Sequence, residues 1–334
     1  MQPIAITLGD PAGIGPEVAA KVLDQAASSE ELQTPWLFVG SRWSLEAGAL
    51  SAGVTLPELP GVSHPDDMQS QNLPMALYDI GVAKPDDFRY GSVQATCGGI
   101  AVQSVEWAAR ACMAGETSAM VTCPLNKEAI HAAGYVDDLG HQEILARLTG
   151  AQWTATMLMT PGLRVAHLST HKSLIQAAQY VTQDTALEKL TLVHETLSTW
   201  GLPDPRIAVA ALNPHGGEGG ILGREEIEEL LPAVTQASAQ GIKATGPIPA
   251  DSVFTRAING EFDVVLALYH DQGHIAIKVH NFHESTTATL GIPFVRTSVD
   301  HGTAFDIAGQ GIANPRGLVA AIQTAEQIVQ GELA

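Results

Sequence analysis

The sequence is poor in basic side chains, in cysteine and in long apolar runs. It has 17 Lys and Arg against 36 Asp and Glu, which gives a formal net charge of −19. A surface this acidic repels the phosphates of nucleic acids and anionic lipids, so neither is expected as a partner. No apolar run approaches the ~20 residues of a membrane helix. The amino-terminal segment also lacks a basic region and a signal-length apolar run, so we expect a cytoplasmic protein with no membrane partner.

The three cysteines, Cys97, Cys112 and Cys123, have no paired spacing. They give no disulfide framework, which is typical of a reducing compartment, and buried structural thiols are favoured over a nucleophile. Hydrophobic residues make up 45% of the 334 residues and charged residues only 16%. This composition excludes a disordered chain and allows two domains with a substantial core.

Strand-like and helix-like segments alternate along the whole sequence. Strands are predicted at residues 3–9, 36–40, 75–81, 118–124, 153–160, 164–169, 206–213 and 262–269. Helices are predicted at residues 16–27, 41–50, 92–113, 126–134, 140–150, 183–200, 224–241 and 315–330. This alternation predicts an α/β fold with mainly parallel sheets and helices on both faces. No linker marks a domain boundary, so we expect a chain that leaves one domain and later returns to it.

Three histidines lie in three dense polar segments, each directly after a predicted strand. They are His171 in LSTHKS, His215 in NPHGGE and His270 in YHDQGH. Loops at the carboxyl ends of parallel strands converge on a ligand crevice in open α/β sheets. Three imidazoles delivered there could hold a divalent metal with open coordination positions, which suits catalysis. Such a metal could bind and polarise a substrate oxygen.

The segment YHDQGHIAIK places four titratable side chains, His270, Asp271, His274 and Lys278, within nine positions. Burying them without partners would be costly, so the segment indicates a functional site rather than part of the core. Lys278 could pair with a phosphate or a carboxylate. We expect His274 to act beside His270 rather than as a ligand itself, because His270 is closer to the strand end.

Three further segments carry candidate polar groups. Arg296 follows the apolar run IPFV, so we expect it at a strand end, where a guanidinium suits bidentate capture of an anion. His141 in GHQE precedes a helix and could face an anion at its amino terminus, or could be a capping or surface histidine. Asp251 precedes another helix, as an N-cap or as a carboxylate that orients a metal-bound histidine.

The segment GDPAGIGPE, residues 9–17, has three glycines that allow tight turning before a helix. It could hold an anion or place Asp10 in a cleft. It does not match the G-x-G-x-x-G fingerprint, so it is not interpreted as a Rossmann dinucleotide site.

Taken together, these segments form a recognisable series. GDPAGIGPE, PLNKEAI, GHQE, STH, NPHGGE, GPIPAD, YHDQGHIAIK and RTSVDHGTAFDIAG occur in this order over about residues 4–328. The sequence resembles the 4-hydroxythreonine-4-phosphate dehydrogenase family of pyridoxal phosphate (pyridoxine, vitamin B6) biosynthesis. The resemblance implies an oxidoreductase that oxidises the secondary alcohol of 4-hydroxy-L-threonine 4-phosphate with NAD or NADP, followed by decarboxylation. The family also contains 4-phospho-D-threonate and 4-phospho-D-erythronate dehydrogenases, which act in sugar-acid catabolism.

The resemblance also implies the architecture. It indicates two α/β/α domains similar to those of isopropylmalate and isocitrate dehydrogenases, with a cleft between the domains. We expect residues 1–130 with 285–334 to form the first domain and residues 131–284, which carry the metal-ligand loops, to form the second. A homodimer with an active site shared between subunits is implied, as is a divalent metal such as zinc, magnesium or cobalt.

Residue roles follow from the same resemblance. The metal ligands match His171, His215 and His270, and the substrate contacts match His141, Gln142, Lys278, Thr287 and Arg296. Gln142 and Thr287 stand where the family usually has threonine and asparagine, so the substrate could differ from 4-hydroxythreonine 4-phosphate. Asp251 and Asp271 fall on acidic positions near the family's active site. Lys278, Asp271 and a metal-bound water remain alternatives for the general base, and residues 287–313 are expected to form part of the cofactor site.

Two interpretations from other classes compete with this one. A metal-dependent hydrolase or lyase without nicotinamide would also use three histidines and an anion pocket. A binding protein without catalysis is less favoured, because all three candidate ligands and the candidate anion-binding residues are retained.

Overall fold

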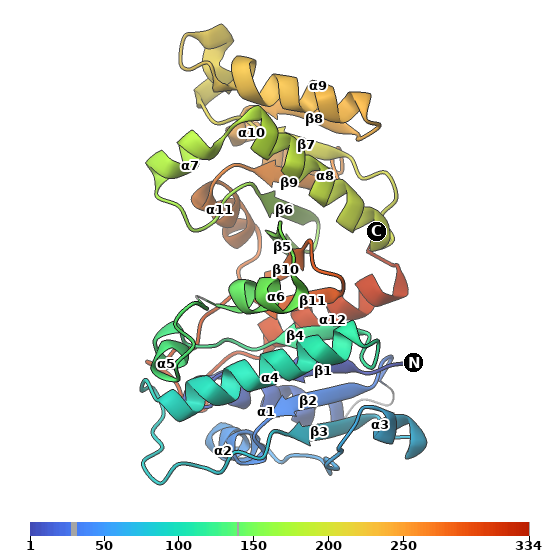
Figure 1. Cartoon of the computed structure of the whole chain (residues 1–334), viewed down its shortest axis with the longest axis vertical. Helices are drawn as coiled ribbons and strands as arrows, with labels where there is room; N and C mark the ends of the chain where they lie inside the picture. The colour runs from blue at the N-terminus through green and yellow to red at the C-terminus, as the bar shows by residue number, and fades with distance from the viewer. Residues whose placement is uncertain (28–31, 139, 334) are drawn as a thin grey trace. The chain divides into compact units, whose positions relative to one another are not determined.

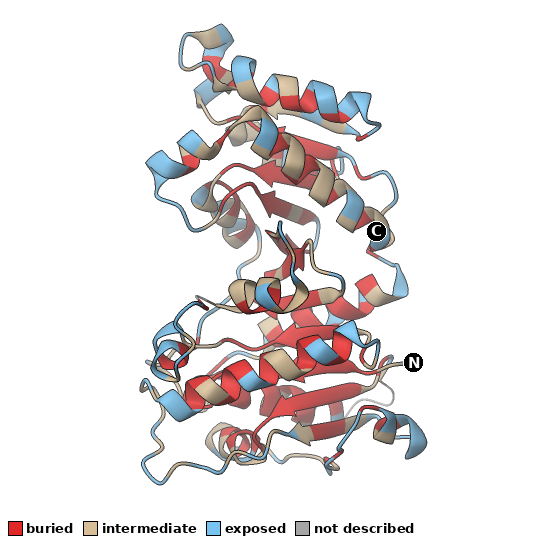
Figure 2. Cartoon of the chain, viewed as in Figure 1, coloured by how far each residue is buried: buried red, intermediate tan, exposed pale blue. Residues whose placement is uncertain are grey.

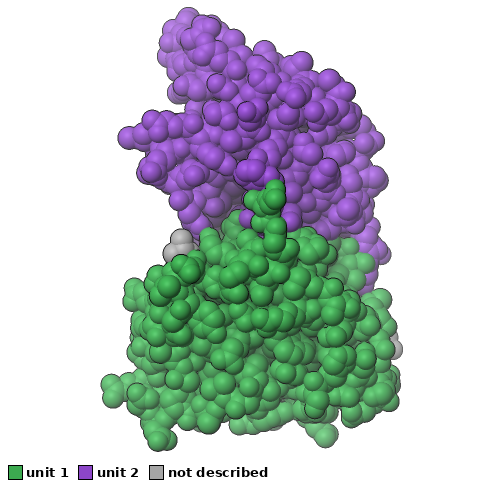
Figure 3. All heavy atoms as spheres, in the orientation of Figure 1, with its two compact units in different colours: residues 1–152, 292–329 green, residues 153–291, 330–334 purple. Residues whose placement is uncertain are grey.

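The computed structural model describes residues 1–27, 32–138 and 140–333. The chain divides into two compact units, coloured separately in Figure 3. Unit 1 consists of residues 1–152 and 292–329, and unit 2 of residues 153–291 and 330–334. Each unit contains a mostly parallel sheet with helices packed on it, so the predicted α/β class is confirmed. No helix in the described ranges is long and apolar enough to cross a membrane.

The sheet of unit 1 is fully parallel. Its strands are β1 (Ile4–Thr7), β2 (Trp36–Gly40), β3 (Met75–Asp79), β4 (Ala119–Thr122) and β11 (Val295–Val299). They lie in the order β3-β2-β1-β4-β11 (Figure 1). The strands read as continuous apolar runs because both faces of this sheet are covered, and Figure 2 shows them buried.

Helices cover both faces of this sheet. They are α1 (Gly15–Ala27), α2 (Arg42–Ala52), α3 (Asp66–Ser70), α4 (Ala95–Met113), α5 (Lys127–Ala132), α6 (His141–Thr149) and α12 (Arg316–Gln330). Successive strand side chains point to opposite faces, so Ile4 and Ile6 pack with α1 and α12. Ala5, between them in sequence, packs with α4, α5 and α6 on the other face.

The helix α6 belongs to unit 1, although the sequence placed it in the second domain. Its side chains Ile144 and Leu145 are fully buried in the same apolar cluster as Val105 of α4. The first unit therefore extends to residue 152 instead of ending near residue 130. The helical pattern alone shows that α6 has an apolar face, but it does not show which sheet that face covers.

The sheet of unit 2 is mixed. Its strands are β5 (Ala155–Thr160), β6 (Leu163–His167), β7 (Ile207–Ala210), β8 (Ala244–Ile248), β9 (Val264–Ala267) and β10 (Thr286–Leu290), in the order β10-β5-β6-β9-β7-β8. The strand β5 runs antiparallel to both β10 and β6. A tight turn connects β5 to β6. The strands β6, β9, β7 and β8 are mutually parallel.

The helices of unit 2 are α7 (Leu174–Tyr180), α8 (Gln183–Thr199), α9 (Leu231–Ala239), α10 (Ala250–Ile258) and α11 (His270–His280). The helices α10 and α11 bury Val253 and Ile277 against Val265 of the sheet. The helix predicted at residues 224–241 is confirmed for most of its length, but its first part, Glu226–Leu230, is a π-helical turn that leads directly into α9. Pro232 explains the π-helical turn, because proline has no N–H to donate to the preceding turn.

Candidate functional site

The three predicted metal ligands follow neighbouring parallel strands of unit 2. His171 follows β6, His270 follows β9 and His215 follows β7, and these strands are adjacent in the order β6-β9-β7. Asp251 follows β8, the next strand. Parallel strands end at the same edge of a sheet, so the predicted placement of these loops at a common edge is confirmed.

Side chains that the sequence did not single out tie these loops together. The Ser169 hydroxyl donates to the carbonyl oxygen of Leu268 at 3.1 Å, which joins the ends of β6 and β9. The buried amide of Gln272 donates to the carbonyl oxygen of Ala211 at 2.8 Å, which joins the start of α11 to the end of β7. The same amide accepts from the Leu268 N–H at 2.7 Å.

The loop that carries His215 has an unusual backbone. His215 and Glu218 have φ values of 55° and 46°, within a left-handed turn that spans Pro214–Gly220. Such values are uncommon for residues other than glycine, and they cluster at functional sites. The carboxylate of Glu226, which is 3% exposed, accepts from the N–H groups of Leu212 and Asn213 at 2.9 and 2.7 Å. These bonds fix the start of the loop.

His270 is the first residue of α11. Its ring Nδ1 lies 2.7 Å from the Oδ1 of Asp271, so a neutral imidazole would donate from Nδ1 and keep its lone pair on Nε2. A carboxylate that holds one ring nitrogen in this way is a common feature of histidines that bind metals through the other nitrogen.

The donors of one chain do not form a complete metal centre. Among residues 1–27, 32–138 and 140–333, no group of three or more His, Cys, Asp or Glu side chains is placed to hold a metal ion. His171 and His215 are both exposed to solvent. The fold therefore brings the three loops to one edge without gathering the three rings, and the metal ligation by His171, His215 and His270 stays a prediction.

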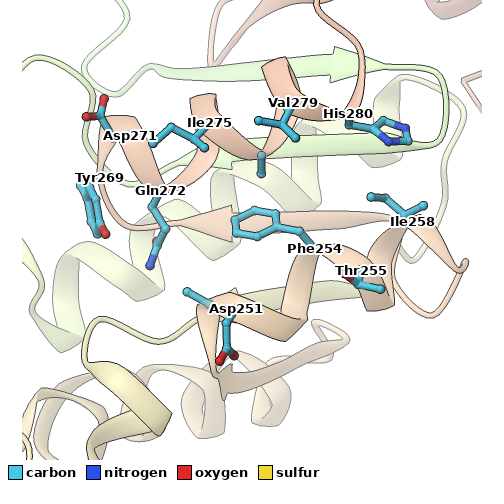
Figure 4. Close-up of a pocket in the computed structure, with 12 residues that line it drawn as sticks. Asp251, Phe254, Thr255, Ile258, Tyr269, Asp271, Gln272, Ile275, Val279 and His280 are labelled. Atoms are coloured by element: carbon cyan, nitrogen blue, oxygen red, sulfur yellow. The ribbon is translucent and has the colours of Figure 1, made fainter.

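Asp251 and Asp271 line a groove between α10 and α11 with a volume of about 720 Å³. Most of the lining is apolar, including Phe254 and Ile275 (Figure 4). Asp251 lies in the first turn of α10, so its interpretation as an N-cap is wrong; Pro249 occupies the cap position. The two carboxylates give this otherwise apolar groove two acidic groups.

Lys278 and Thr287, two predicted substrate contacts, lie elsewhere in unit 2. Lys278 is in the last turn of α11, about 10 Å along the helix axis from Asp271, and its Nζ lies 5.4 Å from the centre of the Phe282 ring. Thr287 is half-buried in β10, opposite Leu158 of β5. Lys278 and Asp271, two of the candidate general bases, are therefore at opposite ends of one helix.

Arg296 occupies a different place from the one predicted. It is the second residue of β11 and not at a strand end, because the first three residues of the IPFV run, 292–294, lie in a bend that includes Pro293 and follows Gly291 at φ 87°. Arg296 is 7% exposed, and its Nη2 donates to the Thr122 hydroxyl at 2.6 Å. Burial lowers the pKa of Arg296 to about 10, so the side chain is still a cation at neutral pH.

His141 lies near this cation in unit 1. It is the first residue of α6, and Gln142 is the second. Burial lowers the pKa of His141 well below its usual value, the charge of Arg296 lowers it further, and a contact with the Cys123 carbonyl opposes both. Its Nε2 is buried without a hydrogen-bond partner in the described parts of the chain. A neutral imidazole beside a buried guanidinium is suited to an anion.

The GDPAGIGPE loop is joined to the segment after β11. The N–H of Ile14 donates to the carbonyl oxygen of Thr303 at 3.0 Å. The carboxylate of Glu17 accepts from the Ala313 N–H at 2.8 Å, and Lys21 donates to the Ala313 carbonyl oxygen at 2.7 Å. These bonds fix Thr303 and Ala313, which lie in the segment expected to contact the cofactor.

Asp10, in the same loop, is completely buried. Its Oδ1 accepts from the Ala12 N–H at 2.8 Å, while its Oδ2 has no hydrogen-bond partner among the described residues. Burial raises its pKa to about 6. Asp10 is therefore fixed inside unit 1, and it does not line the groove of Figure 4.

The three cysteine thiols are poor candidates for a nucleophile. All three thiols are buried, as predicted, and burial raises the pKa of each to about 12. A thiol with this pKa is almost entirely protonated at neutral pH, which makes it a poor nucleophile.

Sequence reasoning missed His167, the last residue of β6. The ring is 1% exposed, and its pKa falls to about 3, mainly through burial and then through His274 beside it. A signal was present in the sequence, since a histidine stands inside an otherwise apolar strand pattern. Ser169, Gln272 and Glu226 each bond a backbone group that follows a different strand, β9 for Ser169 and β7 for the other two, and the sequence near each residue does not show this.

Comparison with known proteins places the chain in a family. A family model described as "Pyridoxal phosphate biosynthetic protein PdxA" matches residues 31–325. D-threonate 4-phosphate dehydrogenase of Pectobacterium atrosepticum is 40% identical over 325 residues, covering 97% of this chain and 98% of that one. The crystal structure of 4-hydroxythreonine-4-phosphate dehydrogenase from Klebsiella pneumoniae has a TM-score of 0.89 and 38% identity, with 98% of each chain covered. The resemblance seen in the motifs is therefore confirmed, and the chain belongs to the PdxA family.

Proposed function

We propose that the protein is an NAD(P)-dependent dehydrogenase that oxidises the secondary alcohol of a phosphorylated four-carbon hydroxy acid. A hydride passes to the nicotinamide and the hydroxyl proton to a base, which leaves a ketone β to the carboxylate. The bond between the carboxylate and the carbon next to it then breaks, and carbon dioxide leaves. The carbon that carried the carboxylate takes up a proton. Family membership and the names of the relatives support this reaction class.

The observation that carries the proposal is a buried guanidinium beside a neutral imidazole in unit 1. The Arg296 guanidinium is buried beside the neutral ring of His141 and is oriented by the Thr122 hydroxyl. A buried cation is stabilised electrostatically when a ligand supplies the opposite charge. A planar guanidinium also matches the geometry of a phosphate. We assign the substrate phosphate to Arg296 and His141, together with Gln142, which follows His141 in sequence.

His171, His215 and His270 would hold the divalent metal, zinc, magnesium or cobalt, in this proposal. The donors fit such a cation in type, and their loops share one sheet edge. When bound there, the cation would lower the pKa of a coordinated substrate hydroxyl. Asp271 would hold the His270 ring through Nδ1, and Asp251 and Lys278 would be available to orient ligands or move a proton.

We further propose a homodimer whose second subunit completes the site. The exposed apolar side chains Ile275, Val279 and Phe282, on and just beyond α11, support this, since clustered apolar surface often marks an interface. The cofactor would contact residues 287–313, part of which is fixed by Glu17 and Lys21.

Among substrates of this class we favour 4-phospho-D-threonate. Gln142 and Thr287 replace residues that the 4-hydroxythreonine-4-phosphate dehydrogenases usually have, and curated relatives at about 40% identity are named for D-threonate 4-phosphate. 4-Phospho-D-erythronate and 4-hydroxy-L-threonine 4-phosphate are the next candidates. The description of the matching family favours the last of these, within pyridoxal phosphate biosynthesis.

The test is an assay of the purified protein with each of the three phosphorylated acids and with NAD⁺ or NADP⁺. We expect absorbance at 340 nm to rise together with carbon dioxide release, and chelation to stop both. His215→Ala should abolish metal-dependent turnover and keep the fold, while His131→Ala, which removes an exposed imidazole from α5, should retain activity.

Other results would contradict the proposal in distinct ways. Product formation without a change at 340 nm would indicate the metal-dependent hydrolase or lyase. Full activity of His215→Ala after chelation would remove the metal from the mechanism. Binding of metal and cofactor without any product would favour a binding protein.

A further inference from the structure

Three imidazoles from two elements of unit 2 contact one another in a row. The rings of His270 and His274, one turn apart on α11, are stacked with centroids 3.6 Å apart and planes at 9°. The ring of His167, at the end of β6, lies 4.7 Å from that of His274 at an angle of 52°. The row therefore runs from the buried end of a strand to the exposed start of a helix.

The bonds around His274 hold its ring in the stacked position. Its Nδ1 lies 2.9 Å from the carbonyl oxygen of His270, to which it can donate one turn along the helix. The His270 ring is thus supported on one face by His274 and at one edge by Asp271, whose Oδ1 is 2.7 Å from Nδ1. Both contacts leave Nε2 of His270 as the ring nitrogen directed to a ligand.

The ring of His167 packs tightly against α11 at Gly273 and supports the stacked rings of His270 and His274. A Cβ atom at Gly273 would lie 2.3 Å from the Nε2 of His167 and 2.8 Å from a methyl carbon of Val165. Only glycine therefore lets α11 approach the strand this closely. His167 is buried between the strand and the helix, so its ring is held in place and supports the His274 ring that it contacts.

We propose that His274 is a positioning residue, which acts through His270 and is itself supported by His167 across Gly273. It fixes the plane of the His270 ring before any ligand arrives, so less ordering is needed on binding. The inference rests on the proposed role of His270 as a metal ligand. Partners that orient a metal-binding histidine commonly contribute about 10–100-fold to metal affinity.

The experiment measures the affinity of the full-length protein for Zn²⁺ alone, by competition with a chromophoric chelator, together with the melting temperature. We expect His274→Ala to weaken Zn²⁺ binding about 10–100-fold and His274→Phe, which keeps a flat ring against His270, to restore most of it. Gly273→Ala should also weaken binding, since its Cβ displaces the His167 ring. The reference variant is His215→Ala, which removes a proposed ligand.

The outcomes separate this inference from the proposed function. If His215→Ala weakens Zn²⁺ binding while His274→Ala and Gly273→Ala do not, His274 is no positioning residue and the proposed metal site stands. If His215→Ala leaves the affinity unchanged, the metal site itself is wrong and the inference falls with it. Should His274→Ala fail to fold, a comparison of His274→Leu with His274→Phe decides: equal affinities would overturn the role of the flat ring.

Discussion

Two adjacent glycines of α4 should respond in opposite ways to the same substitution. In the interior of a helix, alanine is favoured over glycine by about 1 kcal/mol when nothing else changes. A Cβ at Gly99 would meet only the Cβ of Ala133 and the Gln103 amide, each at 3.9 Å. Gly99→Ala should therefore raise the free energy of unfolding by up to ~1 kcal/mol.

A Cβ at Gly98 would instead collide with the backbone of α5. It would lie 2.1 Å from the carbonyl oxygen of Ala129 and 2.6 Å from the nitrogen of Ile130. Real contacts of this kind need more than 3 Å, so α5 must move by roughly 1 Å, and overpacking of a core typically costs about 1–3 kcal/mol. After the gain in helix propensity, Gly98→Ala should destabilise the protein by up to ~2 kcal/mol.

Urea unfolding of the two variants beside the parent protein checks this expectation. The difference between the variants should be about 1–3 kcal/mol, with Gly99→Ala the more stable. Because the two positions share one helix, their intrinsic propensities cancel in the comparison. Equal stabilities, or a more stable Gly98→Ala, would show that α4 and α5 are not in the close contact described and would refute the reasoning.

Two further predictions concern buried ionisable groups. The raised pKa of Asp10, about 6 against an ordinary 3.8, means that its stabilising contribution is complete below pH ~4 and is lost as the pH rises through 6. The stability of Asp10→Asn relative to the parent should therefore rise by about 2 kcal/mol between pH 4 and pH 7, and a pH-independent difference in urea midpoints would contradict the raised pKa. Cys97, Cys112 and Cys123, each with a pKa of about 12, should react with Ellman's reagent only as fast as the protein unfolds, whereas rapid labelling of the native protein would mean that a thiol is accessible.

Much of the element order could be predicted because its signals are local. The buried strands of unit 1 are short apolar runs ended by polar or glycine residues, and α1 is preceded by such a turn, with Pro16 in its first turn. The helix α7 was missed although Ser173 and Gln176 form a capping box at its start, a signature that can be read from sequence. The π-helical turn before α9 was not predicted, although Pro232 is visible there.

The sequence predicted the positions of the histidine loops but not the position of Arg296, and the reason is physical. That His171, His215 and His270 share one sheet edge follows from the rule that parallel strands end together, so strand prediction was sufficient. The position of Arg296 was wrong, because an apolar run does not reveal whether it is a strand or the bend before one. Its proximity to His141 depends on α6 lying on the sheet of unit 1.

The sequence by itself determined the α/β class, the family and the three loops that carry the imidazoles, because periodicity, turn residues and motifs act over short stretches of chain. Only the tertiary structure decided which side chains are desolvated together. It set the Arg296 guanidinium beside a neutral His141, and it seated His274 between His270 and a buried His167. Such placements depend on the close approach of strands and helices that are far apart in sequence, and local sequence patterns do not predict which of them come together.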